Sequence, residues 1–368
     1  MKVLFNAAYD TRSKVGITGF IKCLVPPLSR LCDLTVLTPD PELFADHCAT
    51  IRIPNWVRTH PGRVLWTLTC LPRYCTRDYD LVLCATPAAP IGVRIPVIAV
   101  VHDLTPLIMS QYHPLKHKVI FWVGIQSLRW ADMVVTVSEN TKRDLIMRFP
   151  KVINPSRIQV IYEAPCITPT GDVPEFAQQF APYILYVGGH SPHKNVPRLL
   201  AAFAQLQAPK NYKLILVGWG KQSLFAIARN IAAKHGITGK IVILTDLADN
   251  KLSGLYSKCE AFVYPSLYEG FGLPVLEALA HGAPVACSST SSLPEVADDA
   301  AIYFNPRSVE SITRALELIL NDNSATENLR KRALRQANRF SWAATAQKFY
   351  ACAEALTSGK SGHYEKCR

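Results

Sequence analysis

The chain has no long uncharged apolar run. Among its 368 residues there is no stretch of about 18 uncharged apolar residues, so no membrane-spanning helix is expected. The apolar run after Met1 is too short for a secretory signal, and Lys2–Ala8 has the pattern of a buried strand. These absences favour a cytoplasmic protein.

Motifs for metals and dinucleotides are missing as well. The 11 cysteines are scattered and form no Cys-x-x-Cys pair, so a zinc site is not indicated and a reducing compartment is expected. No Asp-x-Asp sequence is convincing either, so a metal site built on that motif is not expected. The glycines after the first strand do not have the spacing Gly-x-Gly-x-x-Gly, so the dinucleotide fingerprint is absent.

Positive charge is in excess, with a formal net charge of +12 that is spread over both halves of the chain. Two windows, residues 47–77 and 104–131, contain no acid. Surfaces of this kind suit phosphates, anionic lipid or nucleic acid. We do not expect a nucleic-acid partner, because no nucleic-acid motif occurs and the basic residues are not gathered in one place.

Short apolar runs alternate with helical segments along the chain. This alternation predicts an α/β protein with parallel sheets, and the length predicts two domains. The stretch Glu163–Pro182, rich in Pro and Thr, is typical of a linker between them. The predicted strands after the first are Leu34–Thr38, Leu81–Ala85, Val97–Val101, Asp132–Ser138, Ile158–Tyr162, Tyr183–Val187, Lys213–Val217, Ile241–Leu244 and Ala261–Tyr264.

The stretch Val263–Val285 has the most specific pattern. A buried strand ends at Tyr264, glycines then open a loop, and Leu273–Ala280 is rich in helix formers, with Pro274 at the expected first helical position. Glu269 therefore falls in the loop, and Glu277 falls in the helix with seven residues between the two glutamates. A helix N-terminus behind a glycine loop favours anions and hydroxyl-rich groups.

The pattern Pro265-Ser266-x-x-Glu269-Gly270-Phe271-Gly272-Leu273-Pro274-x-x-Glu277-Ala278 resembles the signature of retaining GT-B glycosyltransferases, most closely family 4 (glycosyl transferases group 1). The resemblance implies two Rossmann-like domains facing a central cleft. Residues 1–165 would form the acceptor domain and residues 166–342 the donor domain. Residues 343–368 would form a helix that returns to the N-terminal domain, followed by a polar tail from Gly359. The likeness is strong over residues 183–296 and weak over residues 40–80.

The same resemblance implies roles for the donor-binding residues. Glu269 would hold the hydroxyls of the donor sugar and Glu277 those of the ribose, while backbone near Leu247 would meet the base. The backbone amides against sugar and phosphate would be those of Gly270, Phe271, Gly272 and Leu273.

Two further loops contribute to the expected donor site. The loop Gly188–Asn195 resembles the family's phosphate loop, in which Lys194 is retained and His193 takes the place of the usual arginine. A lysine at a strand–loop–helix junction acts as a point charge on phosphate. Gly16, at the first helix of the N-terminal domain, would let the backbone approach the diphosphate.

The implied reaction retains the anomeric configuration. His102 matches the family's active-site histidine, so His102, Lys194 and Glu269 are the candidate catalytic residues. Charge on the departing diphosphate would be stabilised by Lys194 and backbone amides. The acceptor hydroxyl would attack the face that the diphosphate leaves, and a phosphate oxygen would take its proton, so neither glutamate acts as a nucleophile.

Donor and acceptor are less sharply indicated. The Pro-x-Lys-Asn loop and the ending Arg339-Phe340-Ser341-Trp342 look most like bacterial mannosyl- and rhamnosyl-type transferases, which favours GDP-mannose and a glycan or lipid-linked glycan acceptor. The nucleotide-sugar is then a substrate, and no cofactor is expected. A nucleotide-sugar epimerase of the same fold, or a non-catalytic carbohydrate- or membrane-binding relative, remains an alternative.

The acid-free windows carry aromatic residues among the basic ones. We expect a surface that binds the acceptor or the inner face of an anionic membrane, formed by Trp56, Arg58, Arg63, Trp66 and Arg73. Residues 104–131 add Trp122 and Trp130 to the same half of the chain. Ordinary surface arginines over a core helix are the alternative.

Overall fold

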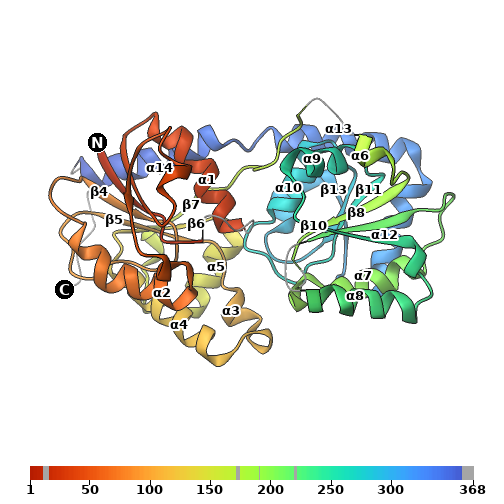
Figure 1. The fold of residues 1–368 in the computed structure, drawn as a ribbon, viewed down its shortest axis with the longest axis horizontal. Helices are drawn as coiled ribbons and strands as arrows, with labels where there is room; N and C mark the ends of the chain where they lie inside the picture. Colours follow the sequence, from red (N-terminus) through yellow and green to blue (C-terminus); the bar gives the residue numbers. More distant parts are fainter. Residues whose placement is uncertain (11–15, 171–174, 190, 219–221, 359–368) are drawn as a thin grey trace. The chain divides into compact units, whose positions relative to one another are not determined.

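The computed structural model describes residues 1–10, 16–170, 175–189, 191–218 and 222–358 (Figure 1). The chain forms two compact units. The first comprises Met1–Glu163 and the segment from Ser341, and the second comprises Ala164–Phe340. The expected tail from Gly359 lies outside the described residues, as does His190 of the expected phosphate loop.

The first unit is built on a parallel seven-stranded sheet in the order β3-β2-β1-β4-β5-β6-β7. All five residues of β5 are buried, as expected for a parallel strand that helices cover on both faces. Its strands are β1 (Lys2–Asn6), β2 (Asp33–Thr38), β3 (Ala49–Arg52), β4 (Leu81–Cys84), β5 (Val97–Val101), β6 (Met133–Thr136) and β7 (Ile158–Val160).

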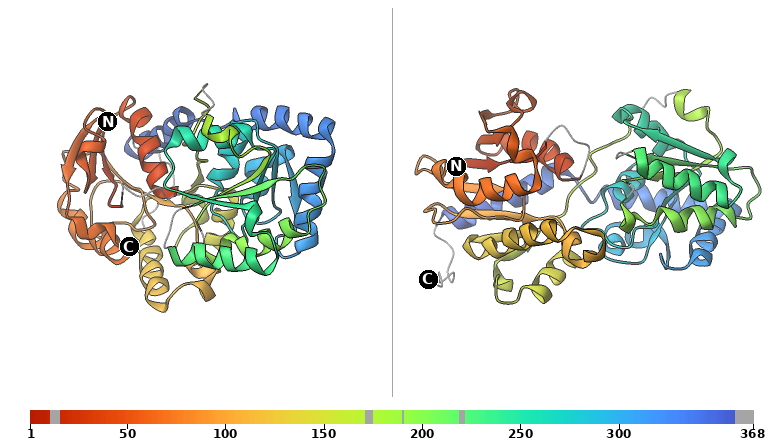
Figure 2. Two further views of the ribbon diagram at one scale, coloured as in Figure 1. Left: turned by 45° about the vertical axis from the view of Figure 1, so that its right-hand side comes forward. Right: turned by 60° about the horizontal axis from the view of Figure 1, so that its bottom comes forward.

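Helices cover this sheet, and Ser138 caps one of them by accepting a hydrogen bond from the backbone N–H of Thr141. The helix that ends the described chain packs against the first one, with Phe349 and Trp342 edge-on to Phe20, so the expected C-terminal return is confirmed (Figures 1 and 2). The helices of this unit are α1 (Gly16–Ser29), α2 (His60–Leu65), α3 (Thr105–Ile108), α4 (Leu115–Ser127), α5 (Glu139–Arg148) and α14 (Trp342–Thr357).

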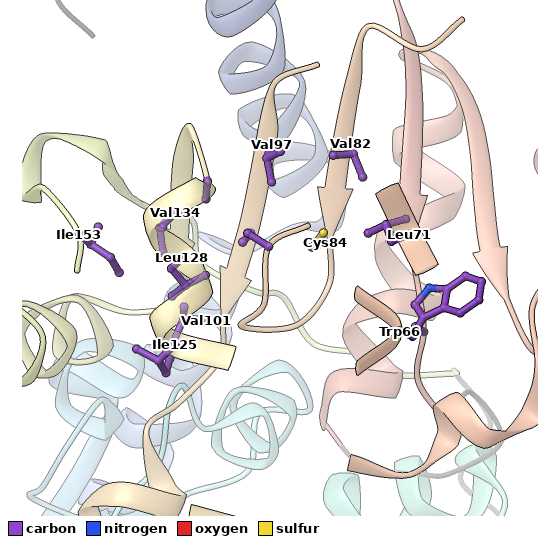
Figure 3. Packing of buried hydrophobic residues seen from close by; sticks show 14 of the residues in the cluster. Trp66, Leu71, Val82, Cys84, Val97, Val101, Ile125, Leu128, Val134 and Ile153 are labelled. Carbon is purple, nitrogen blue, oxygen red and sulfur yellow. The ribbon is translucent and has the colours of Figure 1, made fainter. Parts of the chain in front are cut away.

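One hydrophobic cluster fills the first unit on the side of α2 and α4. Figure 3 shows strand residues such as Val82 and Val97 together with Ile125 and Leu128 from the α4 region. Trp66, from the irregular helical turn after α2, belongs to the same cluster. The cluster therefore fixes α4 to the sheet.

The second unit has a parallel six-stranded sheet in the order β10-β9-β8-β11-β12-β13. Its strands are β8 (Tyr183–Val187), β9 (Lys213–Gly218), β10 (Ile241–Thr245), β11 (Ala261–Tyr264), β12 (Val285–Ser288) and β13 (Ala301–Phe304). Its helices are α6 (Glu175–Gln178), α7 (Val196–Ala204), α8 (Gln222–Lys234), α9 (Asp249–Lys258), α10 (Leu273–Ala280), α11 (Leu293–Ala297), α12 (Val309–Asn321) and α13 (Asn323–Ala337).

Several sequence predictions are confirmed to the residue. The strands at Val97–Val101, Tyr183–Val187 and Ala261–Tyr264 and the helix at Leu273–Ala280 have the expected bounds. Pro274 is the second helical residue rather than the first, because the helix begins at Leu273 after the N-cap Gly272. Among the residues that the structure describes, no helix has the length and apolar character needed to cross a bilayer.

Candidate donor site

The strand order of the second unit locates a binding site. Numbered within this unit, the sheet has the order 3-2-1-4-5-6, and the chain changes direction across the sheet between β8 and β11. In such sheets ligands bind at this switch point, outside the carboxyl ends of the strands. Lys194 lies in the loop after β8 and Glu269 in the loop after β11, so both predicted residues lie at the switch point.

An ion pair joins these two loops. The Nζ atom of Lys194 donates to Oε1 of Glu269 at 2.7 Å and to the hydroxyl of Tyr264 at 3.0 Å. The side chains of Lys194 and Glu269 are only 18% and 12% exposed. Burial alone would raise the pKa of Glu269, but the charge of Lys194, the nearby His193 and hydrogen bonds from Lys194 and Ser266 outweigh it and hold that pKa below its ordinary value. Glu269 is therefore a carboxylate at neutral pH.

Asn195 joins the loop of Lys194 to the loops after β11 and β13. Its side-chain amide donates to the backbone carbonyls of Pro265, at 3.0 Å, and Pro306, at 2.7 Å. Its backbone has φ +62°, a left-handed conformation that Asn tolerates better than most residues. The carbonyl of His193 also accepts from the backbone N–H of Leu267 at 2.8 Å. Lys194 is thus held between two fixed neighbours, and its position relative to Glu269 is set by backbone contacts.

The glycine loop before α10 is tightly packed. Gly272 has φ +112°, and a Cβ there would lie 2.6 Å from Cδ2 of Leu293. The hydroxyl of Ser292 donates to the carbonyls of Glu269 and Phe271, and Ser291 accepts from the backbone N–H of Glu269. The loop therefore presents Glu269 on a fixed backbone at the N-terminus of α10.

Glu277 is buried in α10 beside Tyr256 of α9. The Tyr256 hydroxyl donates to Oε2 of Glu277 at 2.9 Å. Burial raises the pKa of Glu277 to about 7, although hydrogen bonds from Tyr256 and from the backbone of Cys166 and Ile167 oppose the rise. Burial raises the pKa of the Tyr264 hydroxyl, and the carboxyl groups of Glu269 and Glu277 both add to the rise.

His102 follows β5 in the first unit and is buried. Its Nε2 lies 3.0 Å from the carbonyl oxygen of Ala85, and its Nδ1 lies 3.0 Å from Oε1 of Glu163. A carbonyl only accepts, so Nε2 carries a proton. Glu163, the last residue of this unit's first segment, therefore orients the ring from the opposite side.

Comparisons with known proteins agree with this geometry. Residues 17–164 match the family described as Glycosyltransferase Family 4, and residues 175–336 match Glycosyl transferases group 1. O-antigen chain mannosyltransferase B of Escherichia coli is 32% identical over 300 residues, which cover 77% of this chain and 74% of that protein. The chain belongs to the family 4 glycosyltransferases. Of the alternatives open from the sequence, this favours the transferase, and the enzyme is a hexosyltransferase.

Solved structures show that this glycosyltransferase has the GT-B fold. Sucrose-phosphate synthase from Thermosynechococcus elongatus has a TM-score of 0.80 at 19% identity, covering 97% of this chain and 99% of that one. HepE of Anabaena, solved in complex with UDP-glucose, has a TM-score of 0.77 at 20% identity, covering 97% and 100%.

Two predicted donor-site residues of the glycosyltransferase lie on other loops. Leu247 is half-buried after the edge strand β10, which β9 separates from β8 in the sheet. Gly16 is the first residue of α1, after β1 of the first unit. Strands β1 and β4 form the switch point of that unit's sheet. The roles of Leu247 and Gly16 in donor binding remain predictions.

Four residues of the glycosyltransferase's sites escaped the sequence analysis. Tyr256 bonds to Glu277 and Ser292 bonds to Phe271, in each case from another element, and Glu163 lies 61 residues from His102 in the sequence. Spacing within one stretch of sequence could therefore not indicate these residues. Asn195 stands next to Lys194 in the Pro-x-Lys-Asn loop, and its neighbourhood could have indicated a role.

The prediction of a basic surface in residues 47–77 is wrong at two positions. Trp66 is 3% exposed and donates to Oδ1 of Asn6 within the core (Figure 3). The Arg58 guanidinium binds both oxygens of Asp40 at 2.7 Å and Asp10 at 3.2 Å. The window lacks acids in sequence, but the fold brings acids to it from two other loops.

The remaining residues of that predicted surface differ in exposure. Trp56 is 42% exposed and Arg73 is exposed, whereas Arg63 is half-buried with its guanidinium 4.0 Å from the ring centre of Tyr9. The window therefore offers a weaker surface for lipid or acceptor than its composition indicated.

Proposed function

We propose that this enzyme transfers a sugar, with retention of configuration, from a nucleotide-sugar to a glycan or lipid-linked glycan in bacterial surface polysaccharide synthesis. The favoured donor is GDP-mannose. The observation that carries the proposal is the Lys194–Glu269 ion pair at the switch point of the second sheet. Support for mannose comes from the E. coli relative, which is named a mannosyltransferase of the O-antigen chain.

The donor would bind with its charges matched to this site. Glu269, an ionised and hydrogen-bonded carboxylate, would accept hydrogen bonds from the sugar hydroxyls. Lys194 and the N-terminus of α10 would offset the negative charge of the diphosphate. Glu277 would accept hydrogen bonds from the two ribose hydroxyls.

In the proposed reaction, the bond from the sugar's anomeric carbon to the diphosphate oxygen breaks, and a bond to the acceptor oxygen forms on the same face. The acceptor proton passes to an oxygen of the departing diphosphate, so the products are the glycoside and GDP. Glu269 and Glu277 bind hydroxyls throughout and form no covalent intermediate.

We assign His102 to the reacting sugar or acceptor. The ring is fixed by Ala85 and Glu163, and a fixed group costs little reorganisation during the reaction. Replacing Glu163 by Gln would keep a hydrogen-bonding side chain but remove the charge beside the ring.

The donor is tested by thermal shift and by product analysis. Purified enzyme is titrated with GDP, UDP and dTDP, and a nucleotide at 100 times its Kd stabilises the fold by about 2.7 kcal/mol. We expect GDP to give the largest shift and GDP-mannose to yield an α-linked product by NMR. A larger shift with UDP would reject the guanine donor, and a β-linked product would reject retention.

A further inference from the structure

The second acid-free window, residues 104–131, forms a different surface from the first. Helix α4 exposes large apolar side chains to solvent: Leu115 is 71% exposed, Val119 51%, Trp122 49% and Val123 37%. Leu65 of α2, a helix that packs against α4, adds a side chain that is 56% exposed. These five residues define the α4 apolar face.

The spacing of the four α4 residues puts them on one side of that helix. At about 100° per residue, positions 115, 119, 122 and 123 fall within one stripe, and the buried residues Phe121, Gly124 and Ile125 fall on the opposite side. A surface helix of a soluble protein normally presents polar residues on the face away from the core. Helix α4 is apolar on both faces, so its outer face lacks the expected solvent-facing residues.

Packing holds the helix in this orientation. Gly124 lies so close to the loop after β4 that a Cβ there would be 2.7 Å from the carbonyl oxygen of Pro87. Ile125 is fully buried in the core cluster that Figure 3 shows. The apolar face therefore cannot turn inward without breaking the core.

The charged side chains of α4 itself are basic. Lys116 and Lys118 fall on either side of it at helical spacing, and Arg129 follows with its guanidinium 5.6 Å from the ring centre of Trp130. Residues 104–131 contain no Asp or Glu. Basic residues flanking an apolar stripe with a tryptophan are the composition of a helix that lies at a lipid interface.

We infer that the α4 apolar face docks on an anionic lipid bilayer. Trp122 and Val119 would enter the interface, and Lys116 and Lys118 would bind lipid phosphates. Two copies meeting through this face would bring four of these lysines together, so charge disfavours a homodimer. The docking itself does not depend on the proposed function. Its purpose, to bring the enzyme to a lipid-linked acceptor, does rest on that function.

The test is sedimentation of the full chain with vesicles of phosphatidylcholine, with and without phosphatidylglycerol. We expect wild type to pellet with the anionic vesicles and to be released by salt. Val119→Glu with Trp122→Glu should abolish pelleting, and Lys116→Glu with Lys118→Glu should weaken it roughly fivefold or more for each lysine. Met147→Glu and Leu318→Glu, at positions 72% and 52% exposed elsewhere, are the matched controls and should bind like wild type.

Three outcomes would overturn the inference. One is wild type that stays in the supernatant with anionic vesicles at low salt, and another is equal binding to neutral vesicles. The third is a dimer, seen by sedimentation velocity, that Trp122→Glu dissociates. Thermal shift with GDP and transfer to a water-soluble acceptor should be the same in the α4 variants as in wild type. If both assays fail in wild type, that result counts against the proposed function and leaves the docking inference standing.

Discussion

At the scale of single residues, the unusual group is Glu277. It is a buried carboxyl with a pKa raised by burial to about 7, whereas Glu269 in the same motif is held ionised by Lys194. Hydrogen bonds from ribose hydroxyls favour the ionised form of a carboxyl group, so donor binding should release a proton from Glu277.

This predicts a pH dependence of donor binding. Between its ordinary pKa and about 7, Glu277 is protonated in the folded enzyme, so nucleotide affinity should fall as pH drops through 7. Titration calorimetry with GDP between pH 5.5 and 8.5 measures this. Tyr256→Phe removes a donor to Glu277 and should move the midpoint to higher pH. Glu277→Gln should bind more weakly with a flattened profile, and an unchanged profile in that variant would exclude Glu277 as the titrating group.

Asn195 is predicted to position Lys194. Asn195→Gly keeps the left-handed backbone accessible but removes the bonds to Pro265 and Pro306. We expect kcat/KM to fall roughly tenfold, equivalent to about 1.4 kcal/mol. Asn195→Ala should lose a further ~1 kcal/mol of folding stability because of its positive φ. Wild-type kcat/KM in the Gly variant would show that the hydrogen bonds of the Asn195 side chain are not needed to position Lys194.

At the scale of elements, the turn into α10 depends on Gly272. Gly272→Ala puts a Cβ against Leu293 in a left-handed conformation, which should cost about 1–3 kcal/mol of folding stability and weaken GDP binding. Gly239→Ala is the control, because nothing lies within 4 Å of a Cβ there. Denaturant unfolding of both variants checks this, and equal stabilities would mean that the turn relaxes without strain.

The sequence predicted those helices and strands whose boundaries are marked by residues next to them in the chain. Strands β5, β8 and β11 are continuous apolar runs with clear ends, and α10 is bounded by glycine and proline signals. The pairings that build the sites are not local: Lys194 meets Glu269 across 75 residues, and Arg58 meets Asp40 from another loop. Composition of one window could not reveal such partners, which is why Arg58 and Trp66 were misplaced.

At the scale of the whole molecule, both sheets reverse their strand order next to their first strand, so each unit has a switch point for ligands. The one Asp-x-Asp sequence, Asp78-Tyr79-Asp80, precedes β4 and thus lies at the amino end of the strands. Asp80 accepts from the backbone N–H of Lys2, and Asp78 accepts from Thr76. Both acids therefore make local hydrogen bonds at the surface of the first unit, away from the carboxyl ends of the strands.

Metal independence is therefore a prediction about the whole enzyme. Because Lys194 and the N-terminus of α10 would stabilise the leaving diphosphate, transfer should continue in excess EDTA at an unchanged rate. Radiolabelled sugar transfer with and without chelator measures it. Activity lost in EDTA and restored by magnesium or manganese would require a different account of the leaving group.

The most direct test of the central claim is transfer from GDP-mannose by Lys194→Ala and Glu269→Gln variants at saturating acceptor. Each loses a charged hydrogen-bond partner, so kcat/KM should fall by an amount equivalent to about 1.5–3 kcal/mol or more. The double variant should fall by less than the two single effects combined, because the two side chains are partners. Near-native kcat/KM in both single variants would contradict the assignment of the donor site to the switch point of the second sheet.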